Sequence, residues 1–297
     1  VWYAAAVILP LAIAVGMWMN MEGRNEGVIV AQRVQPGSGR AVLELHDGRT
    51  YFLDTTRVVE TGIEGNLAKA EKQSLVYAKQ EAEELVYNKV IIPRAGEYSL
   101  TLSDGTRVWL NSDSEIRYPV AFGKDRRTVF LSGEAYFDVV QDEAHPFIVD
   151  MGNSSVRVLG TSFDVRAYAD EDEVLTTLVQ GSVKFSAGKE FVTLEPGKQA
   201  VLGKSGSIET REVDTYLYTA WKEGVFAFKR QRLEEIMKVV ARWYDVNIFW
   251  ENVSQKEVTF TGKMKRYDDF SKVVEVLEMT GNTEFVIKEN NIFIREK

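Results

Sequence analysis

The chain has 297 residues, which is long enough for two or more domains that each bury a hydrophobic core. Its net charge of -8 and the lack of a basic patch argue against nucleic acid as a partner. Because the chain contains no cysteine, disulfides, cysteine-based metal sites and cysteine nucleophiles are excluded.

The chain begins with an apolar run over residues 1–19 that carries no charged side chain. As a helix this run would be about 28 Å long, close to the hydrocarbon thickness of a bilayer. A cleavable signal peptide is the alternative, but apolar residues continue beyond Ala12-Ile13-Ala14 and no basic region precedes the run. We therefore expect a membrane anchor. The residues that follow show no basic excess, which favours placing residues 20–297 outside the cytoplasm.

A repeated phrase predicts β-hairpins in the part that follows. Apolar and polar residues alternate on both sides of Asp104-Gly105, and the same L-x-L-x-D-G pattern occurs at Asp47-Gly48. Asp-Gly suits the two positive-φ positions of a type I′ turn, so we expect tight turns rather than sites. Residues 20–92 therefore form a β-rich juxtamembrane segment, although two alternatives remain for residues 64–89. Their composition favours a helix, whereas Leu75-Val76-Tyr77 and Leu85-Val86-Tyr87 resemble short strands.

Two further regions differ in their hydrophobic period. Residues 93–213 show short strands with turns every eight to twelve residues, which predicts an all-β domain, either a sandwich or a solenoid-like stack. Residues 214–297 predict a small α+β domain with the order β-α-β-β-α-β-β. Its first helix has apolar residues at helical spacing from Leu233 to Val240, and its second begins after the N-cap Asp268 and ends before Gly281.

Several phrases together resemble the periplasmic region of FecR-like anti-sigma regulators of the Bacteroidetes type. In the family's order they are LSDGTRVWLN (102–111), RYP (117–119), LSGEAYF (131–137), PFIV (146–149), VLGTSF (158–163), TTLVQGSV (176–183), LEPG (194–197), WKEG (221–224) and ARWYDV (241–246). Each phrase alone is unspecific, but their order covers roughly residues 27–297.

The resemblance implies a single-pass inner-membrane protein with the bulk of this chain in the periplasm. In such proteins a short cytoplasmic domain, which would precede Val1, binds an extracytoplasmic-function sigma factor. The periplasmic region receives a signal from the signalling domain of a TonB-dependent outer-membrane transporter, in systems that sense iron chelates or glycans. The C-terminal unit resembles the secretin/TonB short N-terminal domain that these transporters also carry.

Candidate catalytic and metal-binding residues are few. His46 and His145 each lack a second ligand at metal-site spacing, and Ser162 lacks the G-x-S-x-G context of a nucleophile. Asp104 belongs to a turn, whereas Asp138 and Asp164 take outward positions in strand patterns. An acidic run such as 170–173 is more often solvated than bound to a cation. We therefore predict a binding protein that is not an enzyme and has no catalytic, cofactor-binding or metal-binding residues.

Partner binding is expected in the C-terminal unit. If residues 246–250 alternate as a strand, Phe249 points opposite to Trp250, and either ring on an accessible strand suits docking by strand addition. Two other functions stay open from the sequence. One is a membrane-anchored protein of the cell envelope that binds or cleaves glycans, and the other is a structural envelope protein that forms secretin-like rings.

Overall fold

The computed structural model describes residues 34–53, 57–60, 67–71, 73–78, 85–279 and 282–297. The apolar run 1–19 lies outside these residues. Among the residues described, none belongs to a helix that is both long enough and apolar enough to cross a membrane.

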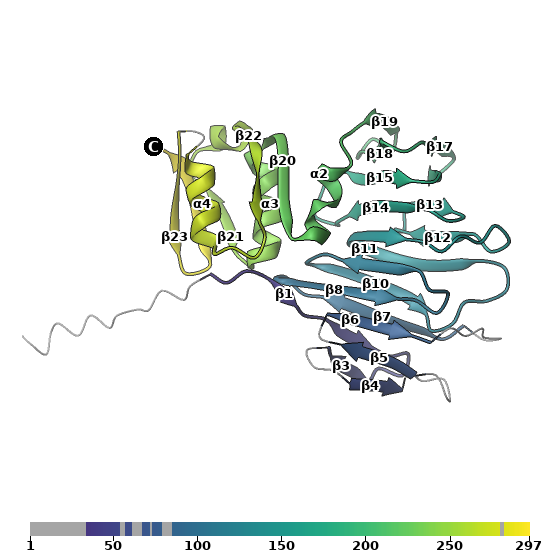
Figure 1. Cartoon of the computed structure of the whole chain (residues 1–297). Helices are drawn as coiled ribbons and strands as arrows, with labels where there is room; N and C mark the ends of the chain where they lie inside the picture. The colour runs from purple at the N-terminus through teal and green to yellow at the C-terminus, as the bar shows by residue number, and fades with distance from the viewer. Residues whose placement is uncertain (1–33, 54–56, 61–66, 72, 79–84, 280–281) are drawn as a thin grey trace, which may run out of the picture.

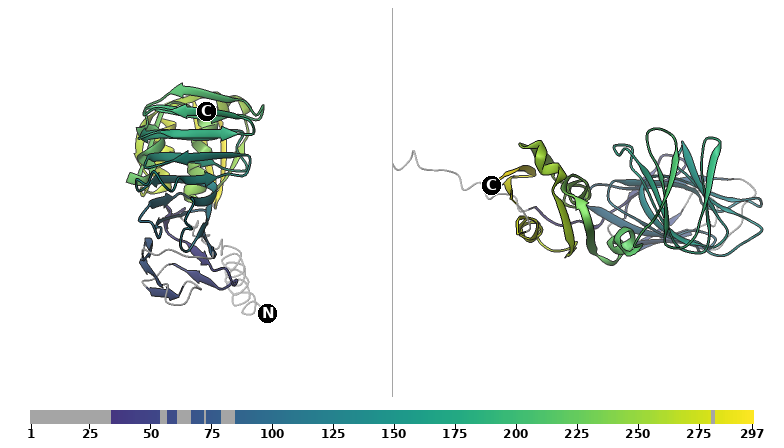
Figure 2. Two further views of the ribbon diagram at one scale, coloured as in Figure 1. Left: turned by 90° about the vertical axis from the view of Figure 1, so that its right-hand side faces the viewer. Right: turned by 90° about the horizontal axis from the view of Figure 1, so that it is seen from above.

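Most of the chain forms two β-sheets that face each other and share one strand, β11 (Figure 1). The first sheet runs in the order β3 (Thr50–Phe52), β2 (Val42–Glu44), β7 (Tyr87–Ile92), β10 (Ser114–Pro119), β11 (Arg127–Asp138), β12 (Phe147–Asp150), β13 (Ser154–Val158), β16 (Val183–Ala187) and β17 (Glu190–Leu194). The second runs in the order β4 (Arg57–Glu60), β5 (Leu67–Glu71), β6 (Ser74–Tyr77), β8 (Gly96–Thr101), β9 (Arg107–Leu110), β11, β14 (Ser162–Ala167), β15 (Val174–Gln180), β18 (Lys198–Leu202) and β19 (Ile208–Glu212). We call these two sheets the sandwich. Its strands lie as successive rungs in Figure 2.

Strand β11 crosses from one sheet to the other at Gly133. Residues 127–132 pair within the first sheet, and residues 133–138 pair with β9 and β14 in the second. Gly133 has φ +101°, and a Cβ atom there would lie 2.4 Å from Ser114 Oγ. Only glycine fits this position, because both the backbone conformation and the close neighbour exclude a side chain.

One hydrophobic core fills the sandwich and contains residues from Ala41 to Leu202. Phe137 from the second sheet stacks on Phe163 with ring centroids 5.1 Å apart and meets Phe147 from the first sheet at 6.1 Å. The strands before residue 93 therefore share their core with those after it. The mainly β prediction is confirmed, and in residues 64–89 the strand alternative is correct for β5 and β6.

The Asp104-Gly105 hairpin is present, but its predicted turn type is wrong. Only Gly105 has positive φ (+89°), and its N–H donates to the Leu102 carbonyl at 2.9 Å. The loop is a type I turn followed by a glycine in the left-handed conformation. Such a loop contains one residue more than a hairpin loop with a type I′ turn. The earlier copy has the same form, with Gly48 at φ +85° and a bond from its N–H to the Leu45 carbonyl at 2.9 Å.

Replacing Gly105 with valine should therefore lower the free energy of unfolding by about 1–3 kcal/mol, because valine resists positive φ. Gly48→Val is the matched variant, since it has the same backbone strain and no heavy atom within 4 Å of the added Cβ. Urea unfolding should give similar losses for both variants. A loss at neither position would contradict the left-handed requirement.

The remaining residues form a C-terminal unit from α2 to β24 with a second hydrophobic core. Its elements are α2 (Tyr216–Thr219), the 3₁₀ helix η1 (Ala220–Glu223), β20 (Val225–Arg232), α3 (Leu233–Tyr244), β21 (Asn247–Trp250), η2 (Val253–Glu257), β22 (Thr259–Lys265), α4 (Phe270–Glu278), β23 (Thr283–Lys288) and β24 (Asn291–Glu296). From β20 onward this is the predicted β-α-β-β-α-β-β order. The N-cap of α4 is Asp269, whose carboxylate accepts from the Ser271 N–H, and not Asp268 as predicted. Gly281 lies outside the described residues.

Candidate partner-binding site

Strand β21 lies at the edge of the three-stranded sheet β21-β24-β23 (Figure 1). It pairs in parallel with β24, and the N–H groups of Asn247 and Glu251 donate to carbonyls of Asn290 and Ile294. Because strand residues alternate in direction, the backbone polar groups of Ile248 and Trp250 face the opposite edge. No strand of the described chain pairs with that edge.

The two predicted binding residues lie on opposite faces of β21. Phe249 is 46% exposed, and its ring stacks on that of Phe293 at 5.1 Å with an interplanar angle of 19°. Trp250 is half-buried and packs against the C-terminal core. Phe249 is therefore the accessible aromatic, whereas Trp250 mainly supports the strand from the other face.

A groove of about 350 Å³ lies between α3 and the open edge of β21. Met237, Ala241, Ile248 and Trp250 give it an apolar lining, and Glu234 and Lys238 of α3 add charges. Arg94, Asp113 and Asp170 of the sandwich also line it. The groove thus borders the place where the C-terminal unit meets the sandwich.

Arg242 of α3 forms the first contact between these two parts. Its guanidinium pairs with Glu171 at 2.5 Å and with Asp170 at 2.6 Å, and it lies 3.7 Å from the centroid of the Tyr168 ring. Glu171 also accepts two hydrogen bonds from Arg166, each 2.7 Å long. Burial raises the pKa of the Glu171 carboxyl, but the two guanidinium groups outweigh burial and hold this pKa below its usual value.

Arg266 forms the second contact and is 1% exposed. It donates to the Trp221 carbonyl at 2.8 Å and to Asn111 Oδ1 of the sandwich at 2.7 Å, and its guanidinium lies 3.9 Å from the centroid of the Trp243 ring. Asn111 in turn donates to Glu134 at 2.6 Å. Burial raises the pKa of Glu134, and the charges of Arg166 and Arg266 oppose this rise without cancelling it.

The segment before β1 (Ser38–Gly39) lies against both parts. Val34 belongs to the C-terminal core, and a Cβ atom at Gly37 would lie 2.6 Å from the Trp243 ring. Ser38 then donates to the Ala95 carbonyl at 3.0 Å, and β1 pairs with β8. The chain therefore passes over the C-terminal unit before it enters the sandwich (Figure 1).

The sequence did not single out Arg242, Arg266 or Gly37. Helical spacing places Arg242 on the face of α3 away from the apolar residues Leu233 and Val240. Arg266 follows β22 and contacts Asn111 across 155 positions. A contact at that separation leaves no signal in a single sequence. The phrase ARWYDV does contain Arg242 and Trp243, but it does not indicate what they contact.

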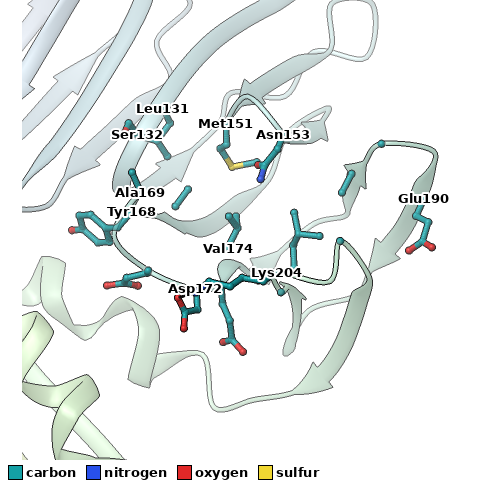
Figure 3. Close-up of a pocket in the computed structure, with 18 of the residues that line it drawn as sticks. Leu131, Ser132, Met151, Asn153, Tyr168, Ala169, Asp172, Val174, Glu190 and Lys204 are labelled. Carbon is teal, nitrogen blue, oxygen red and sulfur yellow. Dashed lines mark ion pairs between the residues drawn. The ribbon is translucent and has the colours of Figure 1, made fainter.

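A cavity of about 690 Å³ opens between the two sheets (Figure 3). It exists because inward side chains become smaller toward this edge, from Val165 to Ala167 on β14 and from Phe185 to Ala187 on β16. The Asp172–Lys204 ion pair, 2.5 Å long, lies at its rim. The acidic run 170–173 thus has side-chain cations as partners at its first three positions.

The carboxylates weighed for catalysis all have hydrogen-bond or ion-pair partners within the protein. Asp164 is buried and accepts from Trp221 Nε1 at 3.1 Å, Asp138 pairs with Arg107, and Asp104 pairs with Arg127 at 2.8 Å. Each of the three carboxylates therefore has a side-chain donor as its partner. Of the other candidates, His145 contacts Asp142 at 2.8 Å, Ser162 donates to Asp138 at 2.9 Å, and His46 is exposed beside its turn.

Two protein-family models match the chain and together cover more than half of it. The model described as FecR protein matches residues 89–184, and the model described as FecR, C-terminal matches residues 225–294. Two crystal structures of a candidate anti-sigma factor from Parabacteroides distasonis are also similar. Their sequences are 26% and 27% identical to this chain, and each superposes with a TM-score of 0.66. The matched regions cover 71% and 70% of this chain, and 99% of each crystallised chain. No curated protein matches the chain.

Proposed function

Since the chain belongs to the FecR-like family of anti-sigma factors, we propose that it is the signal-receiving part of a transmembrane regulator of transcription. Members of this family are regulatory proteins that interact with sigma factors and signalling partners. The outside partner proposed here is the signalling domain of a TonB-dependent outer-membrane transporter. The signal passes to an extracytoplasmic-function sigma factor, whose binding we assign to no residue of this chain.

The proposed organisation has a membrane anchor at 1–19, a β-rich segment at 20–92, an all-β domain at 93–213 and a partner-reading domain at 214–297. The second and third of these share one hydrophobic core. The anchor crosses the inner membrane once, and residues 20–297 lie in the periplasm.

The open edge of β21 is the observation that carries the proposal. An extended segment of the partner can add to this edge through main-chain hydrogen bonds, because the outward N–H and C=O groups of Ile248 and Trp250 are free of strand partners among the described residues. Phe249 supplies an exposed aromatic anchor beside it, and the groove along α3 offers room for side chains of the added strand.

The contacts between the two parts support a direct route for the signal. Arg242 and Arg266 join the C-terminal unit to the sandwich. Gly37 lies against Trp243 and follows residues 1–33, which include the proposed anchor, by only four positions. A partner that shifts the C-terminal unit would therefore move the chain that leads toward the proposed anchor. No long path through the sandwich is needed.

Phe249→Asp should weaken binding of the transporter's signalling domain by at least about thirtyfold, because it removes an exposed aromatic anchor. The fold should survive, since Phe249 is half-exposed and outside the C-terminal core. Calorimetric titration of the chain with that signalling domain measures the effect. Phe191→Asp is the control, because Phe191 is 60% exposed on β17 of the sandwich.

If Phe191→Asp weakened binding while Phe249→Asp did not, the receptor surface would lie on the sandwich. If Phe249→Asp unfolded the protein, the residue would be part of the core and not an anchor. Circular dichroism of each variant separates this result from a loss of binding.

The proposed membrane topology can be tested independently. Alkaline phosphatase fused after Lys297 should be active, because the enzyme needs an oxidising compartment to form its disulfides. The fusion should also stay in the membrane fraction. An inactive fusion, or a soluble product cleaved after Ala14, would overturn the anchored periplasmic arrangement.

A further inference from the structure

Arg157 on β13 and Lys184 on β16 form a pair of like charges in the first sheet. They lie directly opposite each other across the two strands, and both are exposed. Val156 and Phe185, their neighbours along the strands, are fully buried, so alternation directs both cations to the outer face of the sheet. Side chains in such positions have Cβ atoms about 5 Å apart, and like charges there destabilise a sheet. The pair therefore costs stability unless an anion lies beside it.

The neighbouring strands do not supply that anion. Ile148 lies opposite Arg157 on β12, and Thr193 lies opposite Lys184 on β17, so both flanking positions are neutral. Among the described side chains, no carboxylate oxygen lies within 4.0 Å of either cation. Asp150 lies diagonally from Arg157, and its carboxylate accepts a backbone N–H of the following turn at 2.8 Å. Even when Asp150 is counted, the pair leaves a positive charge on this face.

A second like-charge pair in the same sheet shows how such a pair is balanced elsewhere. Arg117 on β10 lies opposite Lys89 on β7. Lys89 pairs with Glu44 of β2 at 3.4 Å and with Glu115 of β10 at 3.6 Å. The sheet thus supplies ion-pair partners to one like-charge pair and, in its described part, none to the other.

The unbalanced pair borders a cavity of about 450 Å³. The β13–β14 loop with Leu159 and the β15–β16 turn with Ser182 form most of its remaining lining, and no acidic residue is among the described residues that line it. Leu159 is 42% exposed and presents apolar surface beside the charges. Ser182 is exposed, and its hydroxyl can donate a hydrogen bond. The volume is within the range of small-ligand pockets.

We propose that this cavity binds the phosphate group of a phosphomonoester whose organic part is apolar. The guanidinium fork of Arg157 donates to two phosphate oxygens, Lys184 adds the second positive charge, and Leu159 contacts the organic part. A phosphomonoester carries roughly two negative charges at neutral pH, so it matches two unpaired cations better than a single carboxylate does.

The site does not depend on the partner-binding proposal. The C-terminal unit packs against the second sheet, where Trp221 donates to Asp164. The outer face of the first sheet therefore lies on the far side of the sandwich from β21 (Figure 1). A ligand of the cavity and a partner at β21 can bind at the same time.

Calorimetric titration of the full chain with phenyl phosphate tests the site, with inorganic phosphate and benzoate as matched probes. We expect saturable binding of phenyl phosphate and about tenfold weaker binding of the other two, because inorganic phosphate lacks the apolar part and benzoate carries a single charge. The affinity for phenyl phosphate should fall as the pH is lowered through about 6, where the phosphate gains a proton and loses a charge. Equal binding of benzoate, or no binding of phenyl phosphate, would overturn the phosphate assignment.

A soluble phosphomonoester and a lipid headgroup offer the same phosphate chemistry. Dihexanoyl phosphatidic acid, a water-soluble lipid with a phosphomonoester head, separates these two sources in the same titration. Tighter binding of phenyl phosphate supports a soluble ligand, and tighter binding of the lipid supports a headgroup. Binding of the lipid with no binding of phenyl phosphate would show that acyl chains, and not the phosphate, are recognised, and the proposal would fail.

Arg157→Gln is the sharpest variant, because the guanidinium has no ion pair, hydrogen bond or ring contact within the described part of the chain. It should bind phenyl phosphate about tenfold more weakly, and without ligand it should be as stable as the wild type or more so, since the repulsion is removed. Lys189→Gln, an exposed lysine in the turn at the other end of β16, should change neither property. Leu159→Ser should weaken binding of phenyl phosphate but not of inorganic phosphate. Wild-type affinity in Arg157→Gln would refute the proposed site.

Discussion

Replacing Arg266 with alanine should lower the free energy of unfolding by about 3–5 kcal/mol, the usual cost of removing one member of a buried charged network. The guanidinium is almost fully buried and donates to both Trp221 and Asn111. Its loss leaves Asn111 Oδ1 and the Trp221 carbonyl without this donor. It also leaves a cavity against the Trp243 ring and removes a cation near the buried Glu134.

The measurement should separate this interface from the rest of the molecule. Two of the six tryptophans, Trp221 and Trp243, lie beside Arg266, so part of the tryptophan fluorescence reports on the contact. Far-ultraviolet circular dichroism reports mostly on the strands. In Arg266→Ala we expect the fluorescence transition in urea to come before the dichroism transition. Arg295→Ala is the control, because Arg295 pairs with Glu284 at the surface and should cost at most about 1 kcal/mol. Equal stability of the two variants would show that the buried network does not hold the two parts together.

Much of the fold could be predicted from local patterns. Period-two alternation found the strands on both sides of Asp104-Gly105, and helical spacing found α3 with Leu233, Ile236 and Val240 buried as expected. The turn type was wrong because Asp-Gly fits more than one turn, and the strand pairing decides which one forms. The N-cap was wrong by one residue because Asp268 and Asp269 are adjacent and either could cap.

The arrangement of the candidate site was less accessible to sequence reasoning. Alternation correctly placed Phe249 opposite Trp250. The edge position of β21, however, depends on its pairing with β24, which lies more than 40 residues later in the chain. The buried arginines are a stronger case. Arg127, Arg242 and Arg266 each contact residues at least 13 positions away, and nothing in their neighbourhoods distinguishes them from solvated arginines.

Gly37→Val should uncouple partner binding from release of the sigma factor. The added Cβ would lie 2.6 Å from the Trp243 ring, which is far inside normal contact. The ring cannot easily move, because its Nε1 donates to the Arg266 carbonyl at 2.5 Å and the Arg266 guanidinium lies on its face. The segment before β1 must therefore lift away from the C-terminal unit, with a cost of about 1–3 kcal/mol in stability.

The signalling domain should still bind this variant, because Phe249 and the open edge of β21 are untouched. Transcription from a sigma-dependent reporter promoter should, however, no longer respond to the transporter's ligand. Gly203→Val is the control, since its φ is not in the left-handed region and the nearest heavy atom to the added Cβ is 4.0 Å away. If Gly37→Val bound the partner and induced the reporter as the wild type does, the signal would have to reach the membrane by another route. The buried contacts of Arg242 with Glu171 and of Arg266 with Asn111 would then be among the remaining connections, since they reach the sandwich without passing through Gly37.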